Sequence, residues 1–223
     1  DNLIEGHAAQ MKPFNIWEKE SWHDFADKVW FEFDYDGEKC GAFRIGGLKD
    51  VVPPPDFKVY RFKDDAWFCA WWNNLRTAYG LELYSRRMRD MQSSERAHRI
   101  LNLALKAPRK NGLFPIVYNR DTGEHHWDRD HMFGGYRDCY HNFDMSWTSY
   151  WLLKWLKDLV PEDTRILPFC LAYGDFLVKS QYENGFIPSY YEEDLTVKPD
   201  TRLNMESAEP AACALFLAEL YSV

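Results

Sequence analysis

The sequence predicts a mainly α-helical protein whose helical hairpins form part of an incomplete (α/α)6-type toroid, with a small β-hairpin region ahead of them. Three observations support this prediction. The strong β-strand signal is confined to the first 45 residues, helical patterns dominate after about residue 65, and the helical part repeats itself. We therefore divide the chain into an N-terminal region, residues 1–65, and a toroid domain, residues 66–223, which we expect to be truncated at its C-terminal end.

The composition excludes several classes of protein. The chain has 223 residues and a formal net charge of −8, which argues against a nucleic-acid partner because phosphate backbones attract basic surfaces. No apolar run reaches the ~18–20 residues that a membrane-spanning helix needs, so we expect no membrane partner. Hydrophobic residues make up 46% of the chain, which is enough for a globular core and excludes disorder.

The N-terminal region carries the β signal. Residues 16–29 mix aromatic and charged side chains and predict a short amphipathic helix. Aromatic residues alternate with acidic ones over 31–35, an Asp-Gly pair supplies a turn, and residues 40–45 predict the return strand of a β-hairpin. Three prolines at 53–55 predict a stiff extended connector, because proline fixes φ and donates no backbone hydrogen bond.

The helical part contains an internal repeat. Residues 111–118, Asn-Gly-Leu-Phe-Pro-Ile-Val-Tyr, recur 73 positions later as residues 184–191, Asn-Gly-Phe-Ile-Pro-Ser-Tyr-Tyr. Asn-Gly readily adopts the positive φ that closes a helix, and the proline three residues after the glycine prevents the helix from resuming. We therefore expect each copy to mark the exit from a helix into an extended loop.

The helices on either side of these copies are of two kinds. Residues 71–88 and 147–159 are apolar nearly all round and predict inner helices that are covered on several sides. Residues 94–107 and 164–180 carry more charge and predict outer helices. A third apolar helix begins near Pro210. Inner helices that alternate with outer ones are typical of helical hairpins in a toroid or solenoid.

The repeat, the aromatic inner helices and the long aromatic loops resemble the six-hairpin glycosidase superfamily, which includes glycoside hydrolases and unsaturated uronyl hydrolases. The resemblance covers residues 66–223 at the level of the superfamily. It implies a carbohydrate-active hydrolase with an oligosaccharide or polysaccharide substrate, bound at the end of the toroid where the long loops collect. Because six hairpins need two helices each, we expect the rest of a longer polypeptide to be missing.

Carboxylates at the start of two inner helices are the candidate catalytic residues. Asp144 lies just ahead of the second inner helix, and Glu206 and Glu209 lie just ahead of the third. Glycoside hydrolysis needs one carboxyl group that donates a proton and one that is ionised, about 5–9.5 Å apart. We predict that Asp144 pairs with Glu206 or Glu209, with the acid and base roles left open. Acids in the first turn of a helix can also serve as caps alone.

Aromatic and basic side chains near the same end are candidates for substrate binding. Aromatic residues make up 17% of the chain, and their rings can stack on the C–H faces of sugars. The predicted substrate-binding residues are Trp71, Trp72, Trp127, Trp147, Tyr190, Tyr191, His131 and Arg137.

Two alternative functions stay open. One is a polysaccharide lyase that removes a proton next to a uronate, for which the loop after the first repeat offers His131, Tyr136, Arg137, Tyr140 and His141. The other is a glycan-binding module without catalytic activity. We predict no metal and no cofactor, because the His and Cys spacing fits no metal motif and nucleotide-binding loops are absent. Five widely spaced cysteines leave the compartment open, and a secreted or periplasmic location is compatible with them.

Overall fold

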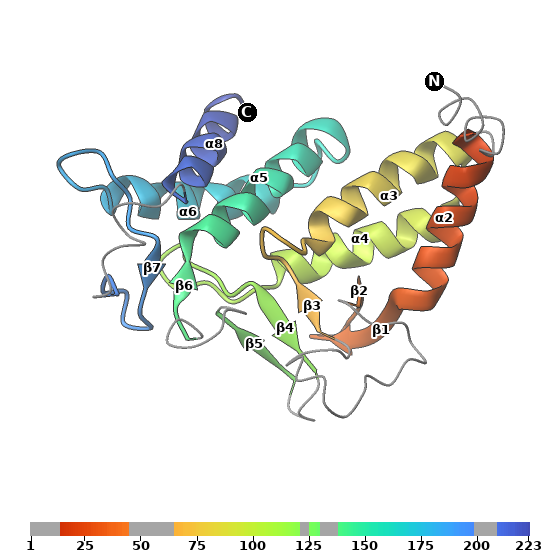
Figure 1. Ribbon diagram of the computed structural model, residues 1–223, viewed down its shortest axis with the longest axis horizontal. Helices are drawn as coiled ribbons and strands as arrows, with labels where there is room; N and C mark the ends of the chain where they lie inside the picture. Colours follow the sequence, from red (N-terminus) through yellow and green to blue (C-terminus); the bar gives the residue numbers. More distant parts are fainter. Residues whose placement is uncertain (1–13, 45–64, 121–124, 130–137, 199–208) are drawn as a thin grey trace, which may run out of the picture.

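The computed structural model describes residues 14–44, 65–120, 125–129, 138–198 and 209–223. These residues form a mainly helical protein, as the sequence predicts, with short antiparallel strands at one end of the helices (Figure 1). In chain order the elements are α2 (Phe14–Val29), β1 (Trp30–Tyr35), β2 (Glu38–Phe43), β3 (Ala66–Trp67), α3 (Asn74–Met88), α4 (Met91–Leu105), β4 (Val117–Asn119), β5 (His126–Asp128), β6 (Tyr140–His141), α5 (Asn142–Asp158), α6 (Ile166–Lys179), β7 (Tyr190–Tyr191) and α8 (Pro210–Tyr221).

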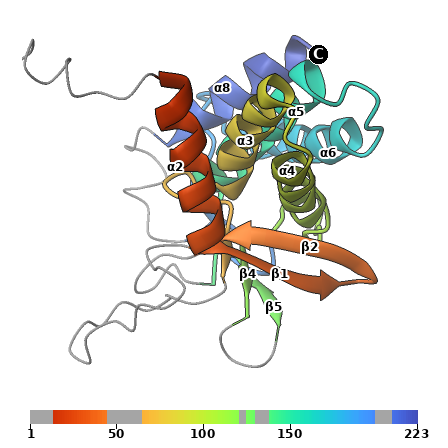
Figure 2. The same ribbon diagram turned by 90° about the vertical axis from the view of Figure 1, so that its right-hand side faces the viewer.

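The N-terminal elements confirm the predicted helix and β-hairpin. Helix α2 contains the expected segment 16–29, and β1 pairs with β2 from Trp30 opposite Phe43 to Tyr35 opposite Glu38. The two-residue turn between the strands has positive φ at Asp36 (51°) and Gly37 (74°), which suits the right-handed twist of a hairpin. The hairpin packs against α4 beneath the helices (Figure 2). The prolines at 53–55 lie outside the described residues.

Two helical hairpins follow, α3 with α4 and α5 with α6. The first inner helix starts at Asn74 instead of Trp71, because the side chain of Asn73 accepts a hydrogen bond of 3.0 Å from the amide of Arg76 and caps the helix there. The second inner helix starts at Asn142, five residues before the expected start at Trp147. Helix α8, which the sequence predicts as the third inner helix, packs on α5.

Each hairpin is closed by a pair of short strands. Strand β3 precedes α3 and pairs with β4, which follows α4; strand β6 precedes α5 and pairs with β7, which follows α6. The same backbone hydrogen bond recurs beside both pairs, from Phe68 to Ile116 and from Asn142 to Ser189, each 2.8 Å long. The repeat in the sequence is therefore also a repeat of structure, in which each unit consists of a strand, two helices and a return strand.

The Asn-Gly pairs have a different role from the predicted helix exit. Helix α4 ends at Leu105, well before Asn111 and Gly112, whose φ angles are 51° and 94°. Lys110 and Leu113 exchange both of their backbone hydrogen bonds across this pair. The first Asn-Gly pair is thus a two-residue turn with positive φ at both positions, which reverses the chain toward β4. Gly185 also has a positive φ, 87°, and it lies six residues beyond the end of α6.

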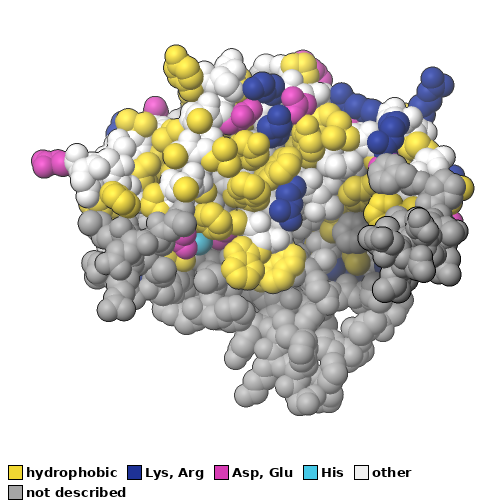
Figure 3. Space-filling view, turned by 45° about the horizontal axis from the view of Figure 1, so that its top comes forward, with side chains coloured by type: hydrophobic (Ala, Val, Ile, Leu, Met, Phe, Trp, Pro, Cys, Tyr) yellow, Lys and Arg dark blue, Asp and Glu magenta, His cyan; other side chains and the backbone are white. Residues whose placement is uncertain are grey.

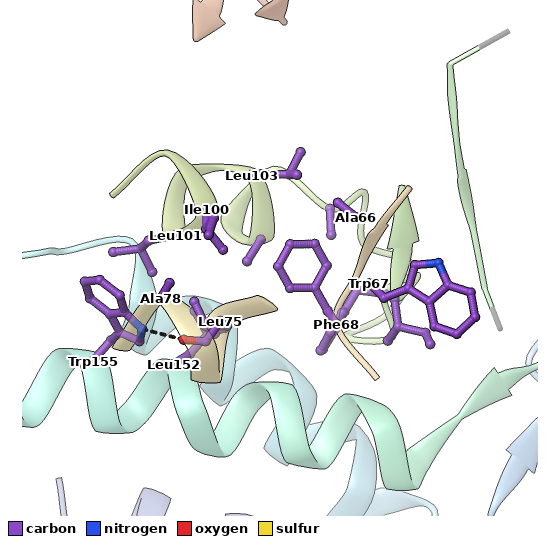
Figure 4. Close-up of a cluster of buried hydrophobic side chains, with 14 of the residues drawn as sticks. Ala66, Trp67, Phe68, Leu75, Ala78, Ile100, Leu101, Leu103, Leu152 and Trp155 are labelled. Carbon is purple, nitrogen blue, oxygen red and sulfur yellow. Dashed lines mark hydrogen bonds between the residues drawn. The ribbon is translucent and has the colours of Figure 1, made fainter. Parts of the chain in front are cut away.

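The core lies where the two hairpins meet. The side chains of Leu75 and Ala78 on α3 are fully buried against Leu152 and Trp155 of α5. Figure 4 shows this cluster, in which the indole N–H of Trp155 donates a hydrogen bond of 3.1 Å to the carbonyl of Leu75. Buried residues of β1, β2 and α2 belong to the same hydrophobic core. In the described ranges, no helix combines the length and the apolar character needed to cross a bilayer.

A buried carboxylate, Glu82, links α3 to α4. It is 3% exposed and accepts hydrogen bonds of 2.8 Å from Arg86 and 2.7 Å from Ser94, while His98 lies 3.8 Å away. Burial raises the pKa of this carboxyl, but the hydrogen bonds from His98, Arg86 and Ser94 outweigh burial and lower it to about 2. Glu82 is therefore ionised in the folded protein at any pH above that value.

Replacing Glu82 by glutamine should lower the free energy of unfolding by about 1–3 kcal/mol at neutral pH, because charge-assisted hydrogen bonds to a buried group are lost. Since the folded pKa is depressed, this contribution is present above the ordinary glutamate pKa and fades as the pH falls from there through about 2. Urea unfolding at several pH values measures it. Glu95→Gln is the control, because Glu95 is 64% exposed and its ion pair with Arg99 should contribute less than about 1 kcal/mol.

Candidate functional site

The candidate site lies at the N-terminal ends of the inner helices. Helices α3, α5 and α8 run in the same direction (Figure 1). At their N-terminal ends, the amide of Ala70 bonds to Asp144, and His141 contacts Glu209. Farther along the helices, Tyr79 bonds to Asp158, and Lys157 pairs with Glu219. The positive ends of the helix dipoles of α5 and α8 therefore point toward one place.

Three side chains meet there. The Nδ1 atom of His141 lies 2.9 Å from Oδ2 of Asp144, and its Nε2 atom lies 3.3 Å from Oε1 of Glu209. The other carboxylate oxygen of Asp144 accepts a hydrogen bond of 2.7 Å from the backbone amide of Ala70, just ahead of α3. We call His141, Asp144 and Glu209 the His141 cluster.

The members of the cluster differ in their access to solvent. Asp144 is 1% exposed and His141 4%, whereas the side chain of Glu209 is 22% exposed. The imidazole ring of His141 stacks on the ring of Tyr190, with centroids 4.3 Å apart and planes within 6° of parallel. This stacking follows from the strand pairing, because His141 of β6 lies opposite Tyr190 of β7. Glu209 is thus the most exposed member of the cluster, with its Oε2 atom buried.

Glu209 is held in its ionised form. Burial raises the pKa of this carboxyl, but the hydrogen bond and the charge of His141, with a further hydrogen bond from Ser189, outweigh burial and bring the pKa below its usual value. Glu209 is also the residue that precedes the first turn of α8, where the helix dipole favours a negative charge. A carboxylate of this kind suits the part of a base or a nucleophile better than that of a proton donor.

A second layer of hydrogen bonds fixes the elements that carry the cluster. The hydroxyl of Tyr173 on α6 donates to the carbonyl of Asn142 (3.0 Å) and lies 2.8 Å from the hydroxyl of Ser146. Ser146 in turn lies 3.3 Å from Sγ of Cys213 on α8. Burial raises the pKa of Tyr173 well above its usual value and that of Cys213 to about 11, so both are neutral. These contacts hold α5, α6 and α8 together directly behind the cluster.

Two exposed tryptophans lie beside the cluster. Trp71 and Trp72 follow Ala70, whose amide is bonded to Asp144, and they are 68% and 48% exposed. Their rings contact each other with centroids 6.2 Å apart, and Trp72 packs edge-on against Trp67. Figure 3 shows a histidine flanked by acidic side chains next to a group of large hydrophobic side chains on this face of the molecule. The Trp71–Trp72 pair is thus an exposed aromatic surface next to Ala70, whose amide is bonded to Asp144.

The other predicted aromatic residues face inward. Tyr190 and Tyr191 are 1% and 3% exposed, so neither presents a ring to a ligand. Trp127 is partly buried on β5, where it packs on Tyr118 and donates a hydrogen bond of 3.1 Å to the hydroxyl of Tyr35. Trp147 is half-buried on α5. These rings stabilise the fold in this structure, because their faces pack on protein groups.

Three predicted site residues, Glu206, His131 and Arg137, lie outside the described residues, as does Tyr136. Of the predicted carboxylates, the structure brings Asp144 and Glu209 together. The place of His141 between these two carboxylates is not among the predictions from the sequence, in which His141 is a candidate only for a lyase. A usable signal was present, because His141 and Asp144 are three residues apart at the start of a helix and can face each other there.

The described part of the chain contains no group of three or more His, Cys, Asp or Glu side chains that could hold a metal ion. The five cysteines are all free and buried, and burial raises the pKa of the Cys40 thiol to about 11, which leaves it unreactive. Two surface hollows, one lined by Leu156 and Leu167 and one by Gly112 and Phe176, contain no residue of the His141 cluster.

Comparisons of the chain with protein-family models, with curated proteins and with solved structures each found no match. The function therefore has to be inferred from the chemistry of the site itself.

Proposed function

We propose that the protein is a glycoside hydrolase in which Glu209 is the ionised carboxylate of the reaction and the Trp71–Trp72 pair binds a sugar ring. The observation that carries this proposal is the contact of Glu209 and Asp144 with one imidazole ring beside two exposed tryptophans. Carboxylates next to aromatic platforms are the groups that cleavage of a glycosidic bond requires.

The roles within the site follow from exposure and charge. Glu209 is the most exposed of the three side chains and has a lowered pKa, so it acts as the base that activates water or as the nucleophile at the anomeric carbon. Asp144 is closed off from solvent, so it acts through His141. Of the carboxylates predicted from the sequence, Glu206 is then the candidate for the proton donor to the leaving oxygen.

The proposal also includes the toroid architecture. Two complete repeat units and the inner helix α8 of a third follow each other in the described residues, and their inner helices run in the same direction. Inner helices of this kind, arranged around a common axis, would bring the loops after each return strand to the end where the His141 cluster lies. The six-hairpin glycosidases, which the sequence resembles, bind substrate at this end.

A screen of neutral and uronate-containing oligosaccharides from plant and host glycans tests the proposal. A hydrolase should incorporate oxygen from isotopically labelled water into the new reducing end, without forming a product that absorbs as an unsaturated uronate. An absorbing product without solvent oxygen would identify a lyase instead. Glycan binding without any cleavage would identify a binding module, and either result would overturn the hydrolase proposal.

Trp71→Ala should raise the KM for the best substrate of this screen about 5–30-fold with a smaller change in kcat. The reason is that a stacked indole contributes about 1–2 kcal/mol to binding through buried apolar surface. Steady-state kinetics measures both constants.

Trp17→Ala is the matched control, because Trp17 is 56% exposed on α2, away from the cluster (Figure 1). Equal effects of the two substitutions would show that the Trp71–Trp72 pair is an ordinary surface feature.

A further inference from the structure

The His141 ring faces a carboxylate oxygen at each of its two nitrogens. Oδ2 of Asp144 lies 2.9 Å from Nδ1, and Oε1 of Glu209 lies 3.3 Å from Nε2. A neutral imidazole carries one donor and one acceptor, so it can satisfy only one carboxylate, while the other carboxylate would face a lone pair. An imidazolium is attracted to both, through a hydrogen bond to Asp144 and an ion pair with Glu209. The geometry therefore favours the doubly protonated ring.

The surroundings fix this ring in place. Asp144 cannot turn away, because its other oxygen is bonded to the amide of Ala70 at 2.7 Å. Tyr190 covers one face of the imidazole at 4.3 Å, which leaves the ring 4% exposed. Rotation of the ring would break two charge-assisted contacts and the stacking together.

Each described element around the ring contributes groups whose charge matters. The charged ones are Asp144 on α5 and Glu209 ahead of α8. Burial raises the pKa values of the other titratable groups, namely Tyr140 on β6, Tyr191 on β7, Tyr173 on α6 and Cys213 on α8, so these groups are neutral. The described charge around the imidazole is thus that of two carboxylates.

We propose that His141 is a positioning residue, which as an imidazolium held by Asp144 and Tyr190 keeps the Glu209 carboxylate ionised and aimed at the reacting sugar. The proposal rests on the proposed function and deepens it, because it assigns Asp144 a part that does not require contact with substrate. Asp144 orients the ring, the ring orients Glu209, and Glu209 touches the substrate.

The first experiment requires neither substrate nor variant. The protein is prepared with isotope-labelled histidine, and the nitrogen shifts of the imidazole of His141 are measured by NMR at neutral pH. We expect both ring nitrogens to carry protons. A neutral ring with one protonated nitrogen would overturn the proposal, whatever the activity of the protein.

The second experiment follows the carboxyl group of Glu209 in the wild-type protein and in His141→Gln. Glutamine can donate one hydrogen bond but carries no charge, so the Glu209 midpoint should rise by about 1–3 pH units when the cation is lost. An unchanged midpoint in a folded variant would overturn the proposal. Should His141→Gln fail to fold, Asp144→Asn serves instead, and it should decrease the protonated fraction of the His141 ring.

The third experiment uses hydrolysis and separates positioning from a structural role. The acid limb of the kcat/KM profile of His141→Gln should move to higher pH together with the Glu209 midpoint. A uniform loss at every pH would show that the substitution only damages the fold, and it would overturn the positioning role. Absence of hydrolysis by the wild-type protein would contradict the proposed function, while the two NMR experiments still decide whether the charged ring controls Glu209.

Discussion

Glu209→Gln should reduce kcat/KM for the best glycoside substrate by roughly a thousandfold, within the 10²–10⁴ range that a positioned carboxylate contributes. The amide has nearly the same shape, and the residue is at the partly exposed edge of the cluster, so the fold should be retained. Substrate affinity should change little, because the Trp71–Trp72 pair is intact. Kinetics together with equilibrium glycan binding measures the two effects separately.

Glu162→Gln is the matched control for this substitution. Glu162 is exposed in the turn between α5 and α6, and the same chemical change there should leave kcat/KM unaltered. A Glu209→Gln variant that is as active as Glu162→Gln would remove Glu209 from the reaction. The wild-type acid limb should also lie below the ordinary glutamate pKa of about 4.3, since the pKa of Glu209 is lowered.

Gly112→Ala should destabilise the fold by about 3 kcal/mol or more. Two costs add at this position, because the φ of 94° is unfavourable for any residue with a Cβ atom and because a Cβ atom there would overlap the backbone carbonyl of Ala172 on α6. Backbone cannot move aside as a flexible side chain can. The midpoint of urea unfolding should therefore fall sharply, and the turn that leads to β4 should be disturbed.

The same substitution in the second copy of the repeat separates these two costs. Gly185 has a φ of 87°, and the nearest atom to a Cβ there is Nε2 of Gln181 at 3.8 Å, an ordinary contact. Gly185→Ala should then lose only about 1 kcal/mol, which is the backbone cost alone. Equal losses in the two variants would mean that the contact between Gly112 and α6 contributes nothing to stability.

The helices were predictable because their apolar patterns are local. The helix boundaries that differ from the prediction depend on hydrogen-bond partners that are distant in the sequence. Helix α5 starts early with Asn142, Asp144 and Ser146, which are polar residues that bury themselves by bonding to Pro188, Ala70 and Tyr173. The two- and three-residue strands β3 to β7 could not be predicted, since strands so short show no alternation and exist through pairing.

The candidate site was predictable where two residues lie at the beginnings of successive inner helices. Asp144 and Glu209 both belong to the beginnings of inner helices, and parallel inner helices bring such residues together. The solvent exposure of the aromatic side chains was less predictable. Tyr190 and Trp71 are both predicted to bind substrate, but Tyr190 is covered by the imidazole across a strand pair, and Trp71 precedes a capped helix with its ring in solvent.

The strand pairs that close the two helical hairpins have a consequence for how the protein can vary. Because the strand that enters a hairpin is bonded to the strand that leaves it, each unit returns the chain to the point where it began. Residues gained or lost within a unit would therefore have to be absorbed between its two paired strands, because the register of each pair fixes where the unit begins and ends.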